Sequence, residues 1–174
     1  KYKGIYLSLV LRPKILPHQA SVFTLLSAVS ICEAIKEITG LDARIKWPND
    51  ILVNHKKLGG ILTELNAEMD EVRFLVIGMG LNVNNDKKAL PLNATSLKSE
   101  LKEDINPALP NDRGLNMIRK GGVNRIELLQ EILRRIEANY LLFQDKGSQP
   151  VVEKWRDYNI TLGRRVKVFF QREH

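Results

Sequence analysis

The chain has 174 residues, 44% of them hydrophobic and 27% charged, which is typical of a globular protein with one domain and part of a second. The single cysteine, Cys32, excludes an intramolecular disulfide and suits a reducing compartment, so we expect a cytoplasmic protein. No apolar run approaches the roughly 20 residues that cross a bilayer, so we expect no membrane-spanning segment. The net charge of +7 is compatible with an anionic partner, such as nucleic acid, an acidic protein or a phosphate-bearing small molecule, but scattered surface lysines that aid solubility explain it better.

The first half of the chain predicts a strand, a helix and then a meander of short strands. The apolar run Ile5–Leu11 has the length of a strand. Within 19–38 apolar residues recur at helical spacing, which predicts one buried stripe that includes Cys32, and Gly40 stands where a C-terminal cap belongs. The strand-like pieces that follow, separated by turn residues, are 43–47, 51–53, 58–65 and 73–77.

The second half predicts a long loop, two helices and a final strand. Residues 103–123 are rich in Pro, Asn, Gly and charge, which indicates a loop or insertion. Asn124 can cap a helix with a strong apolar stripe, and Pro150 is expected to open a short second helix. Residues 165–170 alternate like a strand, although a lone strand is not stable by itself. Because alternating βα units are absent, the order of elements predicts an α+β fold: a mixed sheet with helices mainly on one face.

The segment Lys46-Trp47-Pro48-Asn49-Asp50 gathers several chemical groups into a turn. Pro48 fixes the backbone after a strand, and Trp47 can anchor the turn in the core. Asn49 can then hydrogen-bond a phosphate or ribose, and Asp50 can hold Mg²⁺ through oxygen. An ordinary hairpin turn is the alternative, because Asn and Asp are common turn formers.

Two glycine-containing segments follow. Lys57-Leu58-Gly59-Gly60-Ile61-Leu62 places two glycines inside a strand, which weakens the strand unless a ligand or another backbone approaches closely. Lys57 beside them can stabilise negative charge in a transition state, although a bulge with a solvent-facing lysine is equally compatible. The run from Gly78 to Asn84 (GMGLNVN) lacks the third glycine and the helix of a dinucleotide site. Its glycines can make room for a flat ligand with Asn82 as a polar contact, or form a simple turn.

Taken together and in this order, KWPND, KLGGIL and GMGLNVN closely resemble the biotin–protein ligases. The segments YLSLVL, ATSL and WRDYNITLGRRVKV also match that family's layout, so the resemblance covers nearly the whole chain. It implies a catalytic domain related in fold to class II aminoacyl-tRNA synthetases, with a mostly antiparallel sheet. By this resemblance residues 1–160 form the catalytic domain without its N-terminal biotin loop. Residues 161–174 then begin a small SH3-like barrel, and the chain is expected to be truncated at both ends.

The resemblance implies a two-step reaction with ATP, Mg²⁺ and biotin. Biotin's carboxylate attacks the α-phosphate to give biotinyl-5′-adenylate, and a lysine of a biotin carboxyl carrier domain, typically of a carboxylase, then takes the biotinyl group. The implied roles are catalysis by Lys57; a biotin and adenylate pocket lined by Gly60, Ile61, Leu62, Gly78 and Gly80; ATP binding by Trp47, Asn49 and Asn82; and a magnesium contact from Asp50.

Several features limit what the resemblance implies for this chain. The glycine- and arginine-rich biotin loop of the family is absent, so the chain alone is expected to have weak activity or none. No helix-turn-helix is present, so nothing predicts the DNA-binding repressor role of some family members. A homodimer is possible, because members of the family differ in this respect.

Two other functions fit parts of the same evidence. A lipoate–protein ligase would share the fold and the adenylation chemistry, but KWPND and KLGGIL favour biotin. A basic nucleic-acid-binding domain would need aromatic residues interleaved with lysine and arginine on an exposed sheet face. With aromatic residues at 6%, that support is missing.

Overall fold

The fold is described from a computed structural model, which covers residues 3–103, 118–119 and 122–167. Its main feature is one antiparallel sheet of five strands in the order β1-β5-β4-β3-β2. The strands are β1 (Ile5–Leu11), β2 (Arg44–Lys46), β3 (Asp50–Val53), β4 (Lys56–Ala67) and β5 (Val72–Leu81). A separate two-stranded ladder joins β6 (Ile118–Arg119) to β7 (Gly122–Val123).

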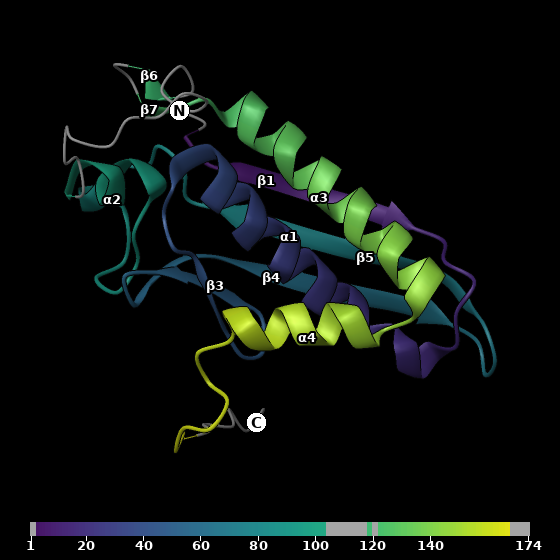
Figure 1. The fold of residues 1–174 in the computed structure, drawn as a ribbon. Helices are drawn as coiled ribbons and strands as arrows, with labels where there is room; N and C mark the ends of the chain where they lie inside the picture. The colour runs from purple at the N-terminus through teal and green to yellow at the C-terminus, as the bar shows by residue number, and fades with distance from the viewer. Residues whose placement is uncertain (1–2, 104–117, 120–121, 168–174) are drawn as a thin grey trace, which may run out of the picture.

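Three helices lie together over one face of the sheet (Figure 1). The structure describes α1 (Ser21–Thr39), α2 (Leu97–Glu103), α3 (Arg125–Lys146) and α4 (Gln149–Tyr158), of which α1, α3 and α4 are the three over the sheet, with 3₁₀ turns at Pro17–Gln19 and Lys87–Ala89. Helix α1 lies against the sheet, and α3 and α4 pack against α1. The predicted α+β fold with helices mainly on one face is confirmed, and every ladder in the main sheet is antiparallel.

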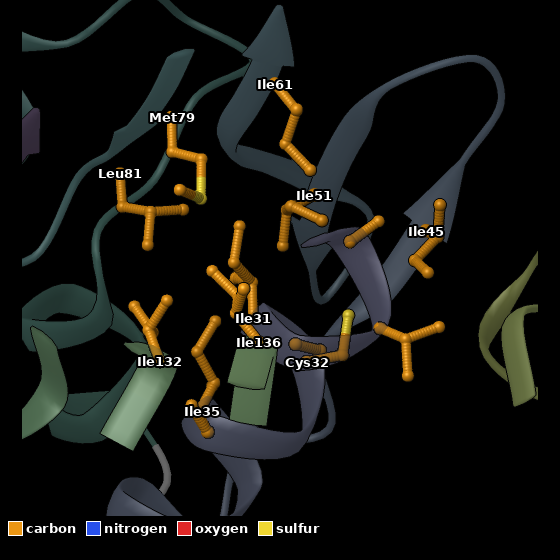
Figure 2. Packing of buried hydrophobic residues seen from close by; sticks show 14 of the residues in the cluster. Ile31, Cys32, Ile35, Ile45, Ile51, Ile61, Met79, Leu81, Ile132 and Ile136 are labelled. Carbon is orange, nitrogen blue, oxygen red and sulfur yellow. The ribbon is translucent and has the colours of Figure 1, made fainter. Parts of the chain in front are cut away.

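The core lies between the sheet and α1 and extends to α3, as Figure 2 shows for side chains such as Ile31, Ile61, Met79 and Ile132. Cys32 is fully buried there, as predicted, and this burial raises the pKa of its thiol well above the ordinary value. The prediction of a single buried stripe on α1 is wrong. Small side chains such as Ala28 and Ser30 are buried as well, because α3 and α4 cover the side of α1 that faces away from the sheet.

A satisfied polar network joins the three helices. The amide of Asn139 on α3 donates to the Ser30 hydroxyl and to Glu33 on α1, each at 3.0 Å. Lys154 on α4 donates to the Asn139 oxygen and to Glu33, each at 2.9 Å. Asn139 is only 2% exposed, so its amide loses its hydrogen bonds to water on folding. The hydrogen bonds to Ser30, Glu33 and Lys154 replace them.

Two predictions about the second half of the chain need correction. Within the predicted loop 103–123, the short ladder β6–β7 forms, while 104–117 and 120–121 lie outside the described residues. Residues 165–167 form no strand, and the rest of the predicted strand, 168–170, lies outside the described residues.

The predicted cap of α3 is confirmed, since the Asn124 side chain accepts a hydrogen bond from the Ile126 amide at 3.1 Å.

The close approach of β4 and β5 depends on Gly59. A β-carbon added to Gly59 would lie 2.1 Å from the carbonyl oxygen of Gly80, so the two backbones would have to separate. We predict that Gly59→Ala lowers the free energy of unfolding of the full-length protein by about 1–3 kcal/mol, measured by urea denaturation.

Gly60→Ala is the matched control for this prediction, because its new methyl group meets nothing nearer than 3.6 Å. It should change the free energy of unfolding by less than about 1 kcal/mol. Equal stability of the two variants would contradict the steric role assigned to Gly59.

The network at Asn139 gives a second prediction. Asn139→Ala leaves the buried Ser30 hydroxyl without its donor and takes one of two donors from Glu33, so we expect a loss of about 1–3 kcal/mol in the free energy of unfolding. Gln149→Ala on α4 removes only an exposed hydrogen bond to Glu153 and should change stability by less than about 0.5 kcal/mol. Thermal and urea denaturation of both variants test this, and an equally small effect at Asn139 would be the contrary result.

Candidate active site

The candidate site lies on the open face of the sheet, opposite the helices. Successive side chains of a strand point to opposite faces, so the antiparallel register decides which residues share that face. One row across the sheet joins Tyr6 on β1, Gly80 on β5, Gly60 on β4 and Asp50 on β3. The next row joins Ser8, Gly78 and Leu62. Glycines therefore occupy the middle of both rows, and larger side chains border them.

The two rows form the floor of an open pocket of about 510 Å³. Its lining is shared by strands β1, β3, β4 and β5 and by the turn before β3: Tyr6, Leu7, Ser8, Asn49, Asp50, Lys57, Gly60, Ile61, Leu62, Gly78, Met79 and Gly80. The glycines leave the backbone uncovered, so a ligand can approach it closely. A β-carbon at Gly60 would project beside the Asp50 carboxylate and the Lys57 side chain, at 3.6 and 3.8 Å.

Lys57 and Asp50 form an ion pair at one end of this pocket. The Lys57 ammonium lies 2.5 Å from a carboxylate oxygen of Asp50, with the Lys57 side chain 52% exposed and that of Asp50 23% exposed. The ammonium is thus held in place yet accessible from the pocket, where an anionic group can approach it. Such a pair contributes little to stability because water screens it, so its position is better explained by chemistry than by folding.

Asn49 is held by both its backbone and its side chain. Its side-chain amide donates to the Ile61 carbonyl at 2.7 Å, and the Ile61 amide donates to the Asn49 carbonyl at 3.0 Å. These two bonds fix the turn that contains Pro48 against β4. The turn thereby presents Asp50 to Lys57 and keeps Asn49 at the pocket wall.

The structure brings together most of the residues predicted for the site. Lys57, Asn49 and Asp50 meet the glycines and Leu62 around one pocket. Ile61 is different, because its side chain is 2% exposed and packs into the core (Figure 2), so its backbone alone can border a ligand.

Two of the predicted residues lie apart from the pocket lining. Asn82 follows the end of β5, where its backbone bonds Leu58 and Leu97. The prediction that Trp47 anchors its turn in the core is wrong, since Trp47 is 55% exposed and its amide donates to the Thr161 hydroxyl at 3.0 Å.

Tyr6 and Ser8 are site residues that the sequence did not single out. The sequence feature that could have identified them is the alternation of the strand Ile5–Leu11. In that strand Leu7 and Leu9 face the core, and Tyr6 and Ser8 face outward. That alternation does not show that the outward residues lie beside Gly80 and Gly78, because the register with a distant strand is not encoded locally.

The residues offer a limited set of metal ligands. Among the described residues, no group of three or more His, Cys, Asp or Glu side chains could hold a metal ion by itself. Asp50 supplies one carboxylate at the pocket.

Among the residues that the structure describes, no helix has both the length and the apolar character needed to cross a bilayer.

Comparisons with known proteins agree with this geometry. Residues 1–82 match the sequence model of the Biotin/lipoate A/B protein ligase family. The chain is 38% identical to the bifunctional ligase/repressor BirA of Bacillus subtilis over 164 residues, which cover 94% of this chain and 46% of that protein. It is 27% identical to a biotin–[acetyl-CoA-carboxylase] ligase of Mycobacterium tuberculosis, covering 94% of this chain and 54% of that protein. The chain thus spans about half the length of the curated relatives it matches.

A solved structure also matches this fold. The biotin protein ligase of Aquifex aeolicus in complex with biotin and ATP superposes with a TM-score of 0.69 at 27% identity, covering 92% of this chain and 60% of that one. The family-model match over residues 1–82 includes every residue that lines the glycine-floored pocket. By sequence and by fold, the chain is similar to the biotin–protein ligases, and its residues 1–82 match the Biotin/lipoate A/B protein ligase family.

Proposed function

We propose that the protein that contains this chain activates biotin with ATP and transfers it to a lysine of a biotin carboxyl carrier domain. In the first step a carboxylate oxygen of biotin bonds to the α-phosphorus of ATP, and pyrophosphate leaves. In the second step the acceptor amine bonds to the acyl carbon, AMP leaves and the amine loses a proton. The observation that carries this proposal is the Lys57–Asp50 pair at the end of a glycine-floored pocket.

Lys57 is the residue that this pocket offers to the developing negative charge. When a carboxylate attacks a phosphate, charge builds on the phosphoryl oxygens, and a cation placed beside them lowers the barrier. The half-exposed Lys57 ammonium can leave its partner Asp50 for a phosphate oxygen without disturbing the core. In the second step the same ammonium is suited to stabilising negative charge at the acyl–phosphate linkage.

Asp50 and Asn49 are suited to the ATP end of the pocket. Mg²⁺ in phosphoryl-transfer sites usually takes one or two protein carboxylates and draws its other ligands from phosphates and water. Asp50 meets that requirement as a single carboxylate, and Mg²⁺ would neutralise phosphate charge there. Asn49 and the more distant Trp47 and Asn82 remain proposed ATP contacts, and the exposed Trp47 ring is accessible to a ligand.

Gly60, Gly78 and Gly80 are proposed to accommodate biotin and the adenylate. Small ligand pockets combine apolar walls with a few polar groups, and this pocket has Tyr6 and Leu62 as walls and the ion pair at one end. The structures of Aquifex aeolicus ligase with biotin and with biotin and ATP support the same ligands here. The free, buried Cys32 suits the reducing cytoplasm that we propose as the location.

Lipoate is the second candidate substrate, because the matching family model includes lipoate ligases. The named relatives reported above are biotin ligases, which favours biotin. Competition between the two acids in the activation assay separates the two substrates.

The role of Lys57 gives a direct prediction. In the full-length protein, Lys57→Ala should reduce biotin-dependent ATP–pyrophosphate exchange by about 10²-fold or more, because a preorganised charge is lost. Stability should change by less than about 0.5 kcal/mol, since the side chain is half exposed. Lys36→Ala, at the far C-terminal turn of α1, is the control and should keep full exchange. Normal exchange by the Lys57 variant would remove Lys57 from the mechanism.

The glycine floor gives a second prediction. Gly60→Ala places a methyl group in the pocket without a clash inside the protein. We therefore expect this variant to bind a non-hydrolysable biotinyl-adenylate analogue about 10- to 100-fold more weakly, measured by calorimetric titration. Unchanged affinity would mean that the adenylate does not lie over Gly60.

A further inference from the structure

The backbone of Lys57 is held by a segment from outside the main ladder. The Lys57 amide donates to the Asn93 carbonyl at 2.9 Å, and the Thr95 amide donates to the Lys57 carbonyl at 2.8 Å. These bonds make a parallel bridge between Lys57 and Ala94. The pairing of β4 with β5 begins only at Gly59, so residues 93–95 take the place of β5 beside Lys57. The position of Lys57 therefore depends on where this segment lies.

One buried carboxylate joins that segment to the β3–β4 hairpin. Glu100 on α2 is 1% exposed, and its carboxylate accepts hydrogen bonds from the Thr95 hydroxyl, from the Asn54 amide at 2.8 Å and from the Lys56 ammonium at 3.3 Å. Asn54 and Lys56 belong to the hairpin, and Thr95 belongs to the segment. Glu100 therefore links the residue before Lys57 to the residue that bonds the Lys57 carbonyl.

The chemistry of Glu100 supports an anionic link. Burial raises the pKa of its carboxyl, but the hydrogen bonds from Thr95, Asn54 and Lys56 and the charge of Lys56 outweigh burial, so the pKa lies below the ordinary value. Glu100 is thus ionised at neutral pH, when it can accept all three donors. Glu100 does not line the pocket, so any effect on the reaction must pass through its neighbours.

We propose that Glu100 is a positioning residue for Lys57, which it holds in place by clamping residues 93–95 to the start of β4. The proposal rests on the function proposed above, in which Lys57 stabilises charge on the phosphate. A glutamine at position 100 keeps the volume of the side chain but offers one acceptor oxygen in place of two. At least one of the three donors then lacks its acceptor, and the clamp loosens.

The test compares Glu100→Gln with Glu131→Gln in the full-length protein. Glu131 is the matched control, since it is also buried and paired with two cations, Arg134 and Arg135, but it lies on α3 away from the pocket. We expect Glu100→Gln to lower kcat for biotin-dependent pyrophosphate exchange by about 10²-fold, as small misplacements do, with little change in KM for biotin. The Glu131 variant should keep its kcat at temperatures where it is folded.

Amide hydrogen exchange separates failure of this proposal from failure of the proposed function. Glu100→Gln should speed exchange at the amides of Lys57 and Thr95 and leave that of Ile61 unchanged. Unchanged exchange at those two amides, or an unchanged kcat, would overturn the positioning role. If the wild-type protein shows no biotin-dependent activity, the proposed function fails, and the exchange rates still decide whether Glu100 holds Lys57. Should Glu100→Gln not fold, Thr95→Val removes one donor only and should change both measurements in the same direction.

Discussion

The rest of the structure depends on one constraint, which is that helices cover only one face of the sheet. The helices α1, α3 and α4 take one face, and the hydrophobic side chains of the strands must point toward them. Because strand side chains alternate, every second residue is then committed to the open face. In β4 this places Ile61 in the core and Gly60 and Leu62 on the open side. The candidate site therefore follows from the same alternation that builds the core.

The two adjacent glycines of β4 show how folding and chemistry divide along one strand. Gly59 faces a neighbouring backbone so closely that no side chain fits, which is a requirement of the fold. Gly60 has room for a methyl group, so the fold does not require a glycine there. We propose instead that the absence of a side chain at Gly60 gives a ligand space beside Lys57 and Asp50.

Local patterns were sufficient to predict much of the fold from the sequence. The helix at α1, the cap at Asn124 and the strand Ile5–Leu11 all depend on residues close together in the chain, and all three are confirmed. The burial of α1 on its outer side was missed because it depends on α3 and α4, more than 80 residues later in the sequence. Long-range packing of this kind leaves little trace in the periodicity of one helix.

The site shows the same division between local and distant information. Lys57, Asp50 and the glycines were assigned to the site because the short motifs that carry them resemble those of a known family. The pocket residues Tyr6 and Ser8 and the proposed positioning residue Glu100 were missed, since register and tertiary contacts alone bring such ordinary strand and helix residues near the pocket. Trp47 was placed in the core because tryptophan is highly buried on average, whereas it is 55% exposed in the turn between β2 and β3.

The most direct test of the central claim is an NMR titration of the full-length protein with a non-hydrolysable biotinyl-adenylate analogue, with the lipoyl counterpart as control. If the open-face pocket is the adenylate site, the biotin analogue should shift the amide signals of Lys57, Gly60, Gly78 and Gly80 and leave those on the outer face of α3 unchanged. The lipoyl analogue should cause smaller shifts at the same concentration. Shifts confined to other surfaces, or none with either compound, would contradict the assignment of this pocket.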